Sequence, residues 1–383
     1  MANRNSDAIS RQYERTSGLR GLTDPLRVVI VAPRIQHLIG GQEVQADLLI
    51  RLWRNDPALH ISYIASNPEL PCWLQRIRYL RTLARFPLYV TRLIAGIRDV
   101  DVVHSFCTAS YGFVISTVPA YCVSRLLRKK VLINYHSPFA LAHLKSSYIA
   151  RYILKSADRV LGPSPFVVDV FRDFGISAQA IPNLVDLSLF SYRSRRPLQP
   201  FLLCSRNLEP YCGIDMVVRA FAEIQKAFPE ARLWILGEGS QEVDLRQLVG
   251  NLRLKGVEMT GRVARQHIGQ FYNKADILIN ASRADNMPVS ILEAFASGLP
   301  VVTTDAGGIP YIVQHEYTGL LSKTDDWQQL AANVIRLLQN PALAERLTEN
   351  AYKQSLAYRW DAVREQWLST YRELCPDGKT RAT

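Results

Sequence analysis

Residues 282–308 read SRADNMPVSILEAFASGLPVVTTDAGG, and this stretch decides the fold of the second half of the chain. Pro288 suits the first turn of a helix, where its missing N–H costs nothing. Val289–Ser297 carries the helical pattern, and Gly298 suits a left-handed helix end. Apolar runs flank this helix at Asp276–Asn280 and Pro300–Thr304. The stretch is therefore predicted to be the loop and helix between two parallel strands.

The same alternation of a short apolar run and a longer helical stretch recurs along the whole chain. Near-continuous Val, Ile and Leu, instead of alternation with polar residues, indicates parallel strands that are covered on both faces. The other predicted strands are Arg27–Ala32, His60–Ala65, Val100–His104, Val131–Tyr135, Arg159–Gly162, Phe201–Ser205, Arg232–Gly237, Val257–Thr260 and Gly319–Ser322. The predicted fold class is α/β, with two doubly wound, Rossmann-like domains. Such sheets bind ligands at the carboxyl ends of their strands, so we expect the ligand in the cleft between the domains.

The domain boundaries follow from composition and periodicity. The segment SLFSYRSRRPLQP (188–200) is rich in Ser, Arg and Pro and reads as a linker. Near the end of the chain, Trp360, Val363, Trp367 and Tyr371 share one helix face. We expect a disordered tail at 1–24, a first domain at 25–187, the linker at 188–200, a second domain at 201–355 and a helix at 356–383 that crosses back to the first domain.

Charge is distributed unevenly. The 383 residues contain 46 Lys and Arg against 34 Asp and Glu, a net charge of +12. Residues 1–200 hold 26 of these cations and 13 of the anions, so the first half carries the whole excess. This predicts that the first domain faces an anionic partner. Hydrophobic residues make up 48% of the chain, which excludes a disordered or fibrous protein.

Several other features narrow the class of protein. The six Cys form no C-x-x-C pair and the sequence has no zinc-ligand spacing, so we expect reduced thiols in a cytoplasmic protein and no metal site. The N-terminus lacks the apolar region of a signal peptide. The uncharged stretch Ser105–Ser124 is interpreted as a buried helix after a strand, because Ser, Thr and Tyr interrupt it. No transmembrane helix is predicted.

Two carboxylates flank the start of the helix in the opening stretch. Asp285 lies in the loop and Glu293, eight residues later, lies about a turn inside the helix. A helix N-terminus binds anions, and flanking carboxylates accept hydrogen bonds from sugar hydroxyls. The alternative is that Asp285 is a solvated charge and that Glu293 forms a salt bridge within the helix.

The stretch resembles the E-x7-E motif of the retaining glycosyltransferases of family 4, which have the GT-B fold. The blocks that carry the resemblance between about residues 27 and 372 are GGQE (40–43), His136, ADRVLGPS (157–164), IPNLVDLSLF (181–190), CSRNLEP (204–210), LGEGS (236–240), EAFASGLPVV (293–302) and DAGGIP (305–310). The resemblance implies transfer of a hexose from a UDP- or GDP-type donor to a glycan or lipid-linked acceptor, in the synthesis of a cell-surface polysaccharide or glycolipid.

The resemblance also implies roles for single residues. Glu293 would bind the ribose hydroxyls, Asp285 the donor sugar, and Arg206 the diphosphate leaving group. His136 would lie beside the donor sugar, the alternative being a hydrogen-bonded histidine at a strand end. The other donor-binding residues that it implies are Gly40 and Gly41, through backbone amides, Arg262 near the base, and Asn286, Met287 and Pro288.

The sequence departs from the family pattern at two positions. Cys212 stands where the family has a second diphosphate-binding Lys, and Tyr311 stands where it has Glu after GG-x-P. The first departure removes a charge-assisted hydrogen bond, typically worth about 1.5–3 kcal/mol. Either another Arg holds the phosphate or the donor is of another type. The resemblance suggests a metal-independent front-face mechanism with retention, because the family lacks a clear nucleophile.

The sequence leaves three other interpretations open. The first is a catalytically weakened protein of the same fold that binds carbohydrate or membrane, favoured by Cys212 and Asp285. The second is a sugar-nucleotide epimerase or phosphorylase of GT-B architecture. The third is an NAD-dependent oxidoreductase, suggested by LGEGS, but Glu242 stands where the dinucleotide fingerprint has its third Gly.

Residues 73–86, WLQRIRYLRTLARF, form a predicted basic amphipathic helix. Trp73 lies on its apolar side, Arg78, Arg81 and Arg85 cluster on another, and Pro87 is expected to end it. A basic amphipathic helix with Trp is typical of attachment to an anionic membrane, and the alternative is a surface helix packed on the sheet. We therefore expect a peripheral protein on the inner face of the cell membrane. No nucleic-acid partner is predicted, because no known binding module is present, and the sequence does not indicate an oligomeric state.

Overall fold

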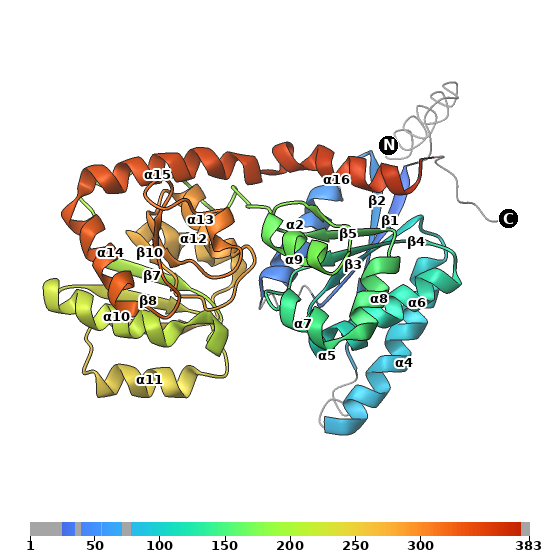
Figure 1. The fold of residues 1–383 in the computed structure, drawn as a ribbon, viewed down its shortest axis with the longest axis horizontal. Coiled ribbons are helices and arrows are strands. Elements are labelled where there is room, and N and C mark those ends of the chain that lie inside the picture. Colours follow the sequence, from blue (N-terminus) through green and yellow to red (C-terminus); the bar gives the residue numbers. More distant parts are fainter. Residues whose placement is uncertain (1–24, 35–39, 55, 71–77, 377–383) are drawn as a thin grey trace, which may run out of the picture.

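The computed structural model describes residues 25–34, 40–54, 56–70 and 78–376, the side chains of 78–84 excepted. Within these ranges the chain forms two parallel sheets of six strands each, with helices on both sides (Figure 1). The sheets lie side by side along the long axis of the molecule, and one helix, α16, runs back along one side to the first (Figure 1). This is the predicted GT-B arrangement.

The first sheet has the strand order β2-β1-β3-β4-β5-β6. Its strands are β1 (Leu26–Ala32), β2 (Leu59–Ala65), β3 (Val102–Cys107), β4 (Lys130–Tyr135), β5 (Arg159–Gly162) and β6 (Gln179–Ala180). The helices of this domain are α2 (Gly41–Trp53), α4 (Arg78–Ile97), α5 (Ser110–Gly112), the π-helical turn η1 (Phe113–Thr117), α6 (Val118–Leu126), α7 (Ala140–Ser146), α8 (Tyr148–Ser156) and α9 (Pro165–Asp173). The short edge strand β6 carries no apolar run and was not predicted.

The second sheet has the order β12-β11-β10-β7-β8-β9. Its strands are β7 (Phe201–Ser205), β8 (Arg232–Leu236), β9 (Val257–Gly261), β10 (Ile277–Ile279), β11 (Val301–Thr304) and β12 (Leu320–Ser322). The helices are η2 (Pro210–Cys212), α10 (Ile214–Ala227), α11 (Glu242–Asn251), α12 (Arg265–Lys274), α13 (Val289–Ser297), η3 (Ile309–Tyr311), α14 (Trp327–Gln339) and α15 (Pro341–Ser355). Pro288 immediately precedes α13, and Gly298 ends it with φ 69°.

Both sheets reverse their strand order at a central pair. The first sheet reverses between β1 and β3, and the second between β7 and β10. Loops that leave neighbouring strands at such a point diverge to opposite sides and leave a crevice. The loops after β1, β7 and β10 carry Gly40, Arg206 and Asp285, so both crevices present predicted site residues to the space between the domains.

The final helix joins the core of the first domain. After η4 (Leu356–Tyr358), α16 (Trp360–Leu374) lays Val363, Trp367 and Tyr371 against the first sheet, all of them buried. Trp360 meets Trp53 of α2 edge to face, with ring centroids 4.7 Å apart. The predicted apolar face of this helix is thus the face that packs.

The segment 188–200 is anchored instead of free. The Arg195 side chain is buried and donates hydrogen bonds to the carbonyl oxygens of Tyr272, Ala275 and Ser297 in the second domain. A buried guanidinium needs such acceptors to offset its desolvation. The segment connects the two domains and packs on the second one.

Two local predictions were wrong. Pro87 does not end its helix, because α4 continues to Ile97 with the proline inside it. Pro87 is exposed, so the carbonyl that loses its N–H partner can be solvated. The stretch Ser105–Ser124 is not a single buried helix: it finishes β3 and then forms α5, η1 and most of α6, with Tyr111 and Val114 exposed. No helix in the described ranges is long and apolar enough to cross a bilayer.

Candidate active site

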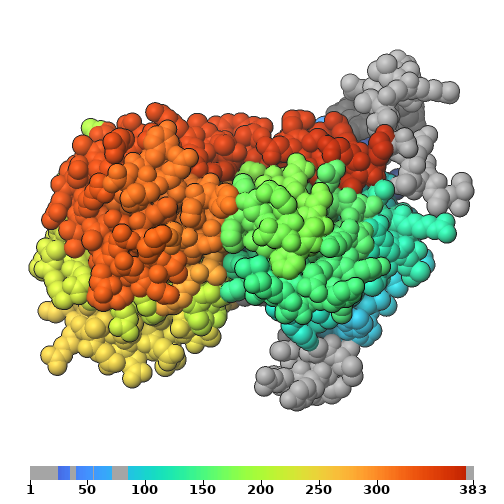
Figure 2. All heavy atoms as spheres, in the orientation of Figure 1, coloured from blue at the N-terminus to red at the C-terminus, as the bar shows by residue number. Residues whose placement is uncertain are grey.

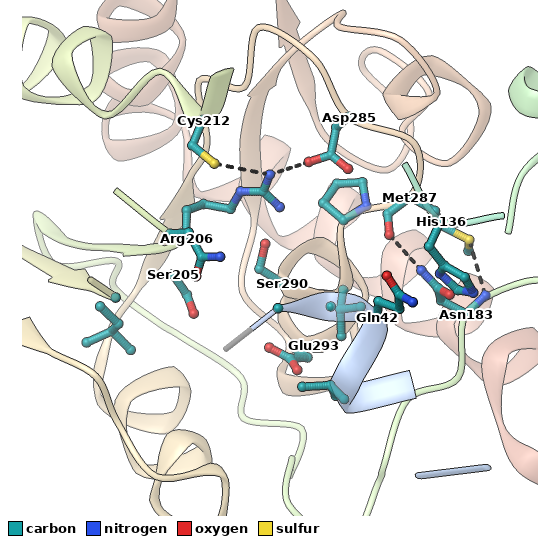
Figure 3. Close-up of a pocket in the computed structure, with 18 of the residues that line it drawn as sticks. Gln42, His136, Asn183, Ser205, Arg206, Cys212, Asp285, Met287, Ser290 and Glu293 are labelled. Carbon is teal, nitrogen blue, oxygen red and sulfur yellow. Dashed lines mark hydrogen bonds and ion pairs between the residues drawn. The ribbon is translucent and has the colours of Figure 1, made fainter. Parts of the chain in front are cut away.

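A cavity of about 270 Å³ lies between the two domains, at the carboxyl ends of both sheets. The predicted catalytic and donor-binding residues all line it: Gly40, Gly41, His136, Arg206, Arg262, Asp285, Asn286, Met287, Pro288 and Glu293. Figure 3 shows the side chains of Arg206, Asp285 and Glu293 from the second domain on one side, and Gln42 and His136 from the first domain on the other. The fold therefore gathers residues from positions 40 to 293 at one site.

Three arginines line the cavity, and each is paired with a carboxylate that lines it too. Arg206 Nη2 lies 2.5 Å from Asp285 Oδ2. Arg265 pairs with Glu293, and Arg262 pairs with Glu238. The cavity thus offers three cations and three anions. A diphosphate that enters it would meet guanidinium groups already oriented by carboxylates, and hydroxyl groups would meet carboxylate acceptors.

The burial of these pairs differs. The Arg265 and Glu293 side chains are 14% and 3% exposed, whereas both members of the Arg262–Glu238 pair are 41% exposed. Burial alone would lower the pKa of Arg206, but the Asp285 carboxylate outweighs it, so the pKa is raised above its ordinary value. The pKa of Arg265 is raised in the same way by Glu293, against the effect of burial. Both guanidinium groups are therefore permanently charged.

Cys212, the residue in place of the family's second cation, lies directly beside Arg206. Its Sγ is 3.6 Å from Arg206 Nη2, and the residue is 1% exposed (Figure 3). Burial raises the pKa of the thiol, although the positive charge of Arg206 opposes this, so the position is neutral. Arg265 and Arg262 are the other cations at the cavity wall, and they supply positive charge that the Cys212 position lacks.

His136 follows β4 and stacks on Phe106, with ring centroids 5.1 Å apart. Burial lowers the pKa of His136 to about 3, so the ring is neutral at physiological pH. A neutral imidazole offers one donor and one acceptor nitrogen. It is suited to hold a hydroxyl group, not to supply a positive charge.

Several buried polar atoms of the cavity wall are left without a protein partner. They are Arg206 Nε, Arg265 Nη2, Ser290 Oγ, Asn286 Nδ2 and His136 Nε2, none of which has a hydrogen-bond partner among the described residues. Unsatisfied buried polar groups are rare and costly in native proteins. Their concentration here indicates a polar ligand with many acceptor atoms.

The glycine-rich turn after β8 fixes the position of Arg206. Gly237 has φ 136°, in the region that favours glycine, and a Cβ there would overlap the carbonyl oxygen of Arg206. A Cβ on Gly239 would lie 2.5 Å from the carbonyl oxygen of Leu208. LGEGS thus supports the loop after β7 instead of forming a dinucleotide fingerprint.

Hydrogen bonds across the cleft join the two domains beside the cavity. Asn183 Nδ2 of the first domain donates to the Met287 carbonyl oxygen at 2.9 Å, and Ser164 bonds Asn286. Tyr311, the second departure from the family pattern, donates its hydroxyl to Asp169 of α9 at 2.8 Å. The loop of Asn286 and Met287 is thus held by the first domain as well as by its own.

Most of the predicted membrane residues have no described side chain. Trp73 lies outside the described residues, and for Arg78 and Arg81 only the backbone, within α4, is described. Arg85 is half-buried in the same helix. The sequence did not point to Arg265, Glu238 or Ser290, which also line the cavity, and Arg265 is the one with the clearest signal. Its position at the start of a helix, one residue after a loop that follows a strand, was the available signal.

Two sequence families cover most of the chain. Residues 26–189 match Glycosyltransferase Family 4, and residues 193–354 match Glycosyl transferases group 1. Together with the fold, these matches show that the chain belongs to the family 4, group 1 glycosyltransferases.

Individual relatives are distant. The chain is 33% identical over 199 residues to an exopolysaccharide phosphotransferase of Streptomyces coelicolor, which covers 51% of this chain and only 21% of that protein. It is 26% identical to the alpha-monoglucosyldiacylglycerol synthase of Streptococcus pneumoniae over 57% of this chain and 54% of that protein. Among solved structures, HepE of Anabaena in complex with UDP-glucose superposes with a TM-score of 0.72 at 17% identity, covering 91% of this chain and all of that one. The structural likeness shows the fold.

Proposed function

We propose that this protein is a retaining glycosyltransferase that moves a hexose from a UDP- or GDP-type donor. One observation carries the proposal. Arg206, Asp285 and Glu293, for which the resemblance implies donor-binding roles, line one cavity between the domains together with buried donors that have no partner among the described residues. Few other ligands combine the acidic phosphates and the many hydroxyl groups that such a wall would satisfy.

Each group has a proposed task. The diphosphate binds Arg206, whose Nε is free to donate, and Arg265 adds positive charge at the wall. Glu293 accepts hydrogen bonds from the ribose hydroxyls and Asp285 from the sugar, while neutral His136 holds a sugar hydroxyl. As the bond between the anomeric carbon and the phosphate oxygen breaks, negative charge grows on the phosphate, and the fixed guanidinium groups stabilise it. The departing oxygen takes the proton of the acceptor hydroxyl, which attacks the same face of the sugar.

The reaction is proposed to need no divalent cation. No group of three or more His, Cys, Asp or Glu suited to a metal occurs in the described ranges. The chain's one D-x-D, Asp99-Val100-Asp101, immediately precedes β3 and does not line the cavity. Arginine side chains take the role that Mg²⁺ has in other phosphate chemistry. Transfer should therefore continue in excess EDTA.

The acceptor is proposed to be a glycan or lipid-linked sugar, used in cell-surface polysaccharide or glycolipid synthesis. The names of the relatives, which include an exopolysaccharide enzyme and a glycolipid synthase, support this class. The excess positive charge of residues 1–200 supports a cytoplasmic protein bound peripherally to the inner face of the cell membrane.

The proposal is tested by thermal unfolding in the presence of UDP, GDP and ADP, because a ligand that binds the folded state raises its melting temperature. UDP or GDP should stabilise the protein, and Arg206→Ala should abolish the effect. The anomeric configuration of the product, read by NMR, tests retention. Binding of the nucleotide without transfer or donor hydrolysis would favour the non-catalytic alternative, and no binding of any nucleotide would refute the proposal.

A further inference from the structure

A surface of exposed apolar side chains and lysines lies on helices α7 and α8. We call it the α7–α8 face, and its members are Leu141, Lys145, Tyr148, Ile149, Tyr152 and Lys155. Tyr148 and Tyr152 are 75% and 62% exposed. The opposite side of α8 is buried through Ile153 and Leu154, so the helix carries apolar groups on its exposed side as well as on its buried side. Soluble proteins seldom expose such a patch without a partner for it.

A second exposed apolar segment adjoins this face. Phe113 of η1 packs its ring edge against His143 of α7, with centroids 5.0 Å apart, which places η1 beside α7. Tyr111, Val114 and Ile115 of the α5–η1 segment are exposed. In Figure 1, α5, α7 and α8 lie together on the side of the first domain away from α16.

The stretch of sequence that forms this face carries charge of one sign, whereas the neighbouring helix α9 carries Asp169 and Asp173. Residues 102–157 contain seven Lys and Arg and not one Asp or Glu. Lys145 and Lys155 are exposed and form no ion pair with any residue that the structure describes. Arg151 lies over the Tyr148 ring at 5.5 Å and so adds positive charge beside an aromatic group. Tyrosines with lysines around them suit the boundary between lipid headgroups and acyl chains.

The face leads directly to the candidate active site. His136 and Pro138 line the cavity, and α7 begins at Ala140. Between them, the exposed Phe139 touches Tyr211 of the second domain, with ring centroids 5.4 Å apart. A lipid-linked acceptor held at the α7–α8 face would therefore have its sugar close to the first-domain wall of the cavity.

We infer that the α7–α8 face is the surface by which this protein docks on an anionic lipid bilayer. Tyr148, Ile149 and Tyr152 insert among the headgroups, and Lys145 and Lys155 contact anionic lipid. The inference rests on the proposed function, because docking would serve to present the cleft to a lipid-linked acceptor. It places the membrane contact on α7 and α8, not on the residue 73–86 segment that the sequence alone favours.

The test measures partitioning of the full chain onto vesicles of phosphatidylcholine with phosphatidylglycerol, and onto phosphatidylcholine alone. The wild type should bind the mixed vesicles more strongly. Lys145→Gln with Lys155→Gln should lower the partition coefficient by about 30-fold, because each basic residue beside an anionic surface strengthens binding several-fold. Tyr148→Ser with Tyr152→Ser should weaken binding to both kinds of vesicle. The matched control is Lys274→Gln with Lys353→Gln, two exposed lysines of the second domain, and it should bind as the wild type does.

Melting temperature and its rise with UDP are measured on each variant, and both should equal those of the wild type. Equal vesicle binding by wild type and the α7–α8 variants would overturn the inference, as would a wild type that binds UDP but no vesicles. A dimer that the Tyr148→Ser, Tyr152→Ser variant dissociates in sedimentation would assign the face to a second copy of the chain and would also overturn it. A wild type that is stabilised by neither UDP nor GDP would instead refute the proposed function.

Discussion

The Arg265 guanidinium and the Glu293 carboxylate form a buried ion pair that joins the start of α12 to the middle of α13. The guanidinium also lies 5.3 Å from the centre of the Phe190 ring, which limits its movement. Arg265 Nη2 has no hydrogen-bond partner among the described residues, so Arg265 can orient Glu293 and still donate to a ligand. We regard it as a positioning residue for Glu293, the carboxylate that is proposed to bind the ribose.

Replacing Arg265 separates this role from general stability. Arg265→Gln leaves a buried carboxylate without its cation, which should lower the free energy of unfolding by about 3 kcal/mol. The KM for the donor should rise about tenfold in Arg265→Gln, equivalent to about 1.4 kcal/mol of binding free energy. Arg265→Lys keeps the positive charge and should retain part of that binding free energy. Steady-state kinetics with varied donor measure this.

Arg262→Gln is the matched control for Arg265. Its pair with Glu238 is exposed, so its loss should change the free energy of unfolding by less than about 1 kcal/mol. If the donor KM of Arg265→Gln equals that of the wild type, the position of the Glu293 carboxylate does not depend on this arginine.

Cys212 is predicted to act as a small, neutral space-filler beside Arg206. Cys212→Ala should leave kcat/KM for the donor within about twofold, since the weak thiol contact contributes little. Cys212→Lys should destabilise the protein, because it buries a second cation next to Arg206 at a site that is 1% exposed. Thermal unfolding and donor kinetics check both variants. Abolished activity in Cys212→Ala would give the thiol a chemical role that the geometry does not.

Gly237 should prove essential for the position of Arg206. Gly237→Ala forces a side chain into a left-handed conformation and against the Arg206 carbonyl, which should cost at least about 2 kcal/mol of stability. Nucleotide affinity should fall as Arg206 moves. Gly250→Ala, with nothing within 4 Å of the added carbon, is the control and should be neutral or stabilising. Equal melting temperatures for the two variants would contradict this.

His104 gives a prediction about pH. It is fully buried, its Nδ1 is 2.8 Å from the Tyr371 hydroxyl, and its ring stacks between Phe106 and Trp367. Burial, with a smaller contribution from nearby His136, lowers the pKa of His104 to about 3 from 6.5. The folded pKa is depressed, so the unfolded chain binds the extra proton as pH falls below about 6.5, and stability is lost there.

The size of this effect can be isolated by mutation. Between pH 7 and pH 5 the histidine should remove about 2 kcal/mol from the free energy of unfolding. His104→Phe lacks the titrating group. The free energy of unfolding of the wild type minus that of His104→Phe should therefore fall by that amount between pH 7 and pH 5. Urea unfolding of both proteins at the two pH values measures this difference. The same difference at pH 7 and pH 5 would contradict the prediction.

The sequence predicts the fold well because parallel strands that are covered on both faces consist of unbroken apolar runs. Strands such as Arg159–Gly162 and Phe201–Ser205 appear where such runs occur. Local rules also located Gly298 as the end of α13. Pro87 shows their limit: the rule that proline ends a helix gave way because an exposed turn tolerates the lost hydrogen bond.

The pairing of charges in the cavity could not be predicted from the sequence. Glu293 and Arg265 are 28 residues apart, and Tyr311 meets Asp169 across 142 residues. The first contact depends on how two helices of the second domain pack and the second on how the two domains face each other, neither of which local periodicity encodes. The same holds for Arg195, which reads as part of a polar linker and is buried by the second domain.

Transfer of label from radiolabelled UDP- and GDP-hexoses to lipid-extractable material tests the central claim most directly. The assay compares the wild type with Glu293→Gln and Arg206→Ala, with folding checked by circular dichroism. We predict transfer by the wild type with at least one donor, also in excess EDTA, and a loss of about 100-fold or more in each variant, as expected when a preorganised charge at the reacting group is removed. Near-normal transfer by either variant would contradict the account.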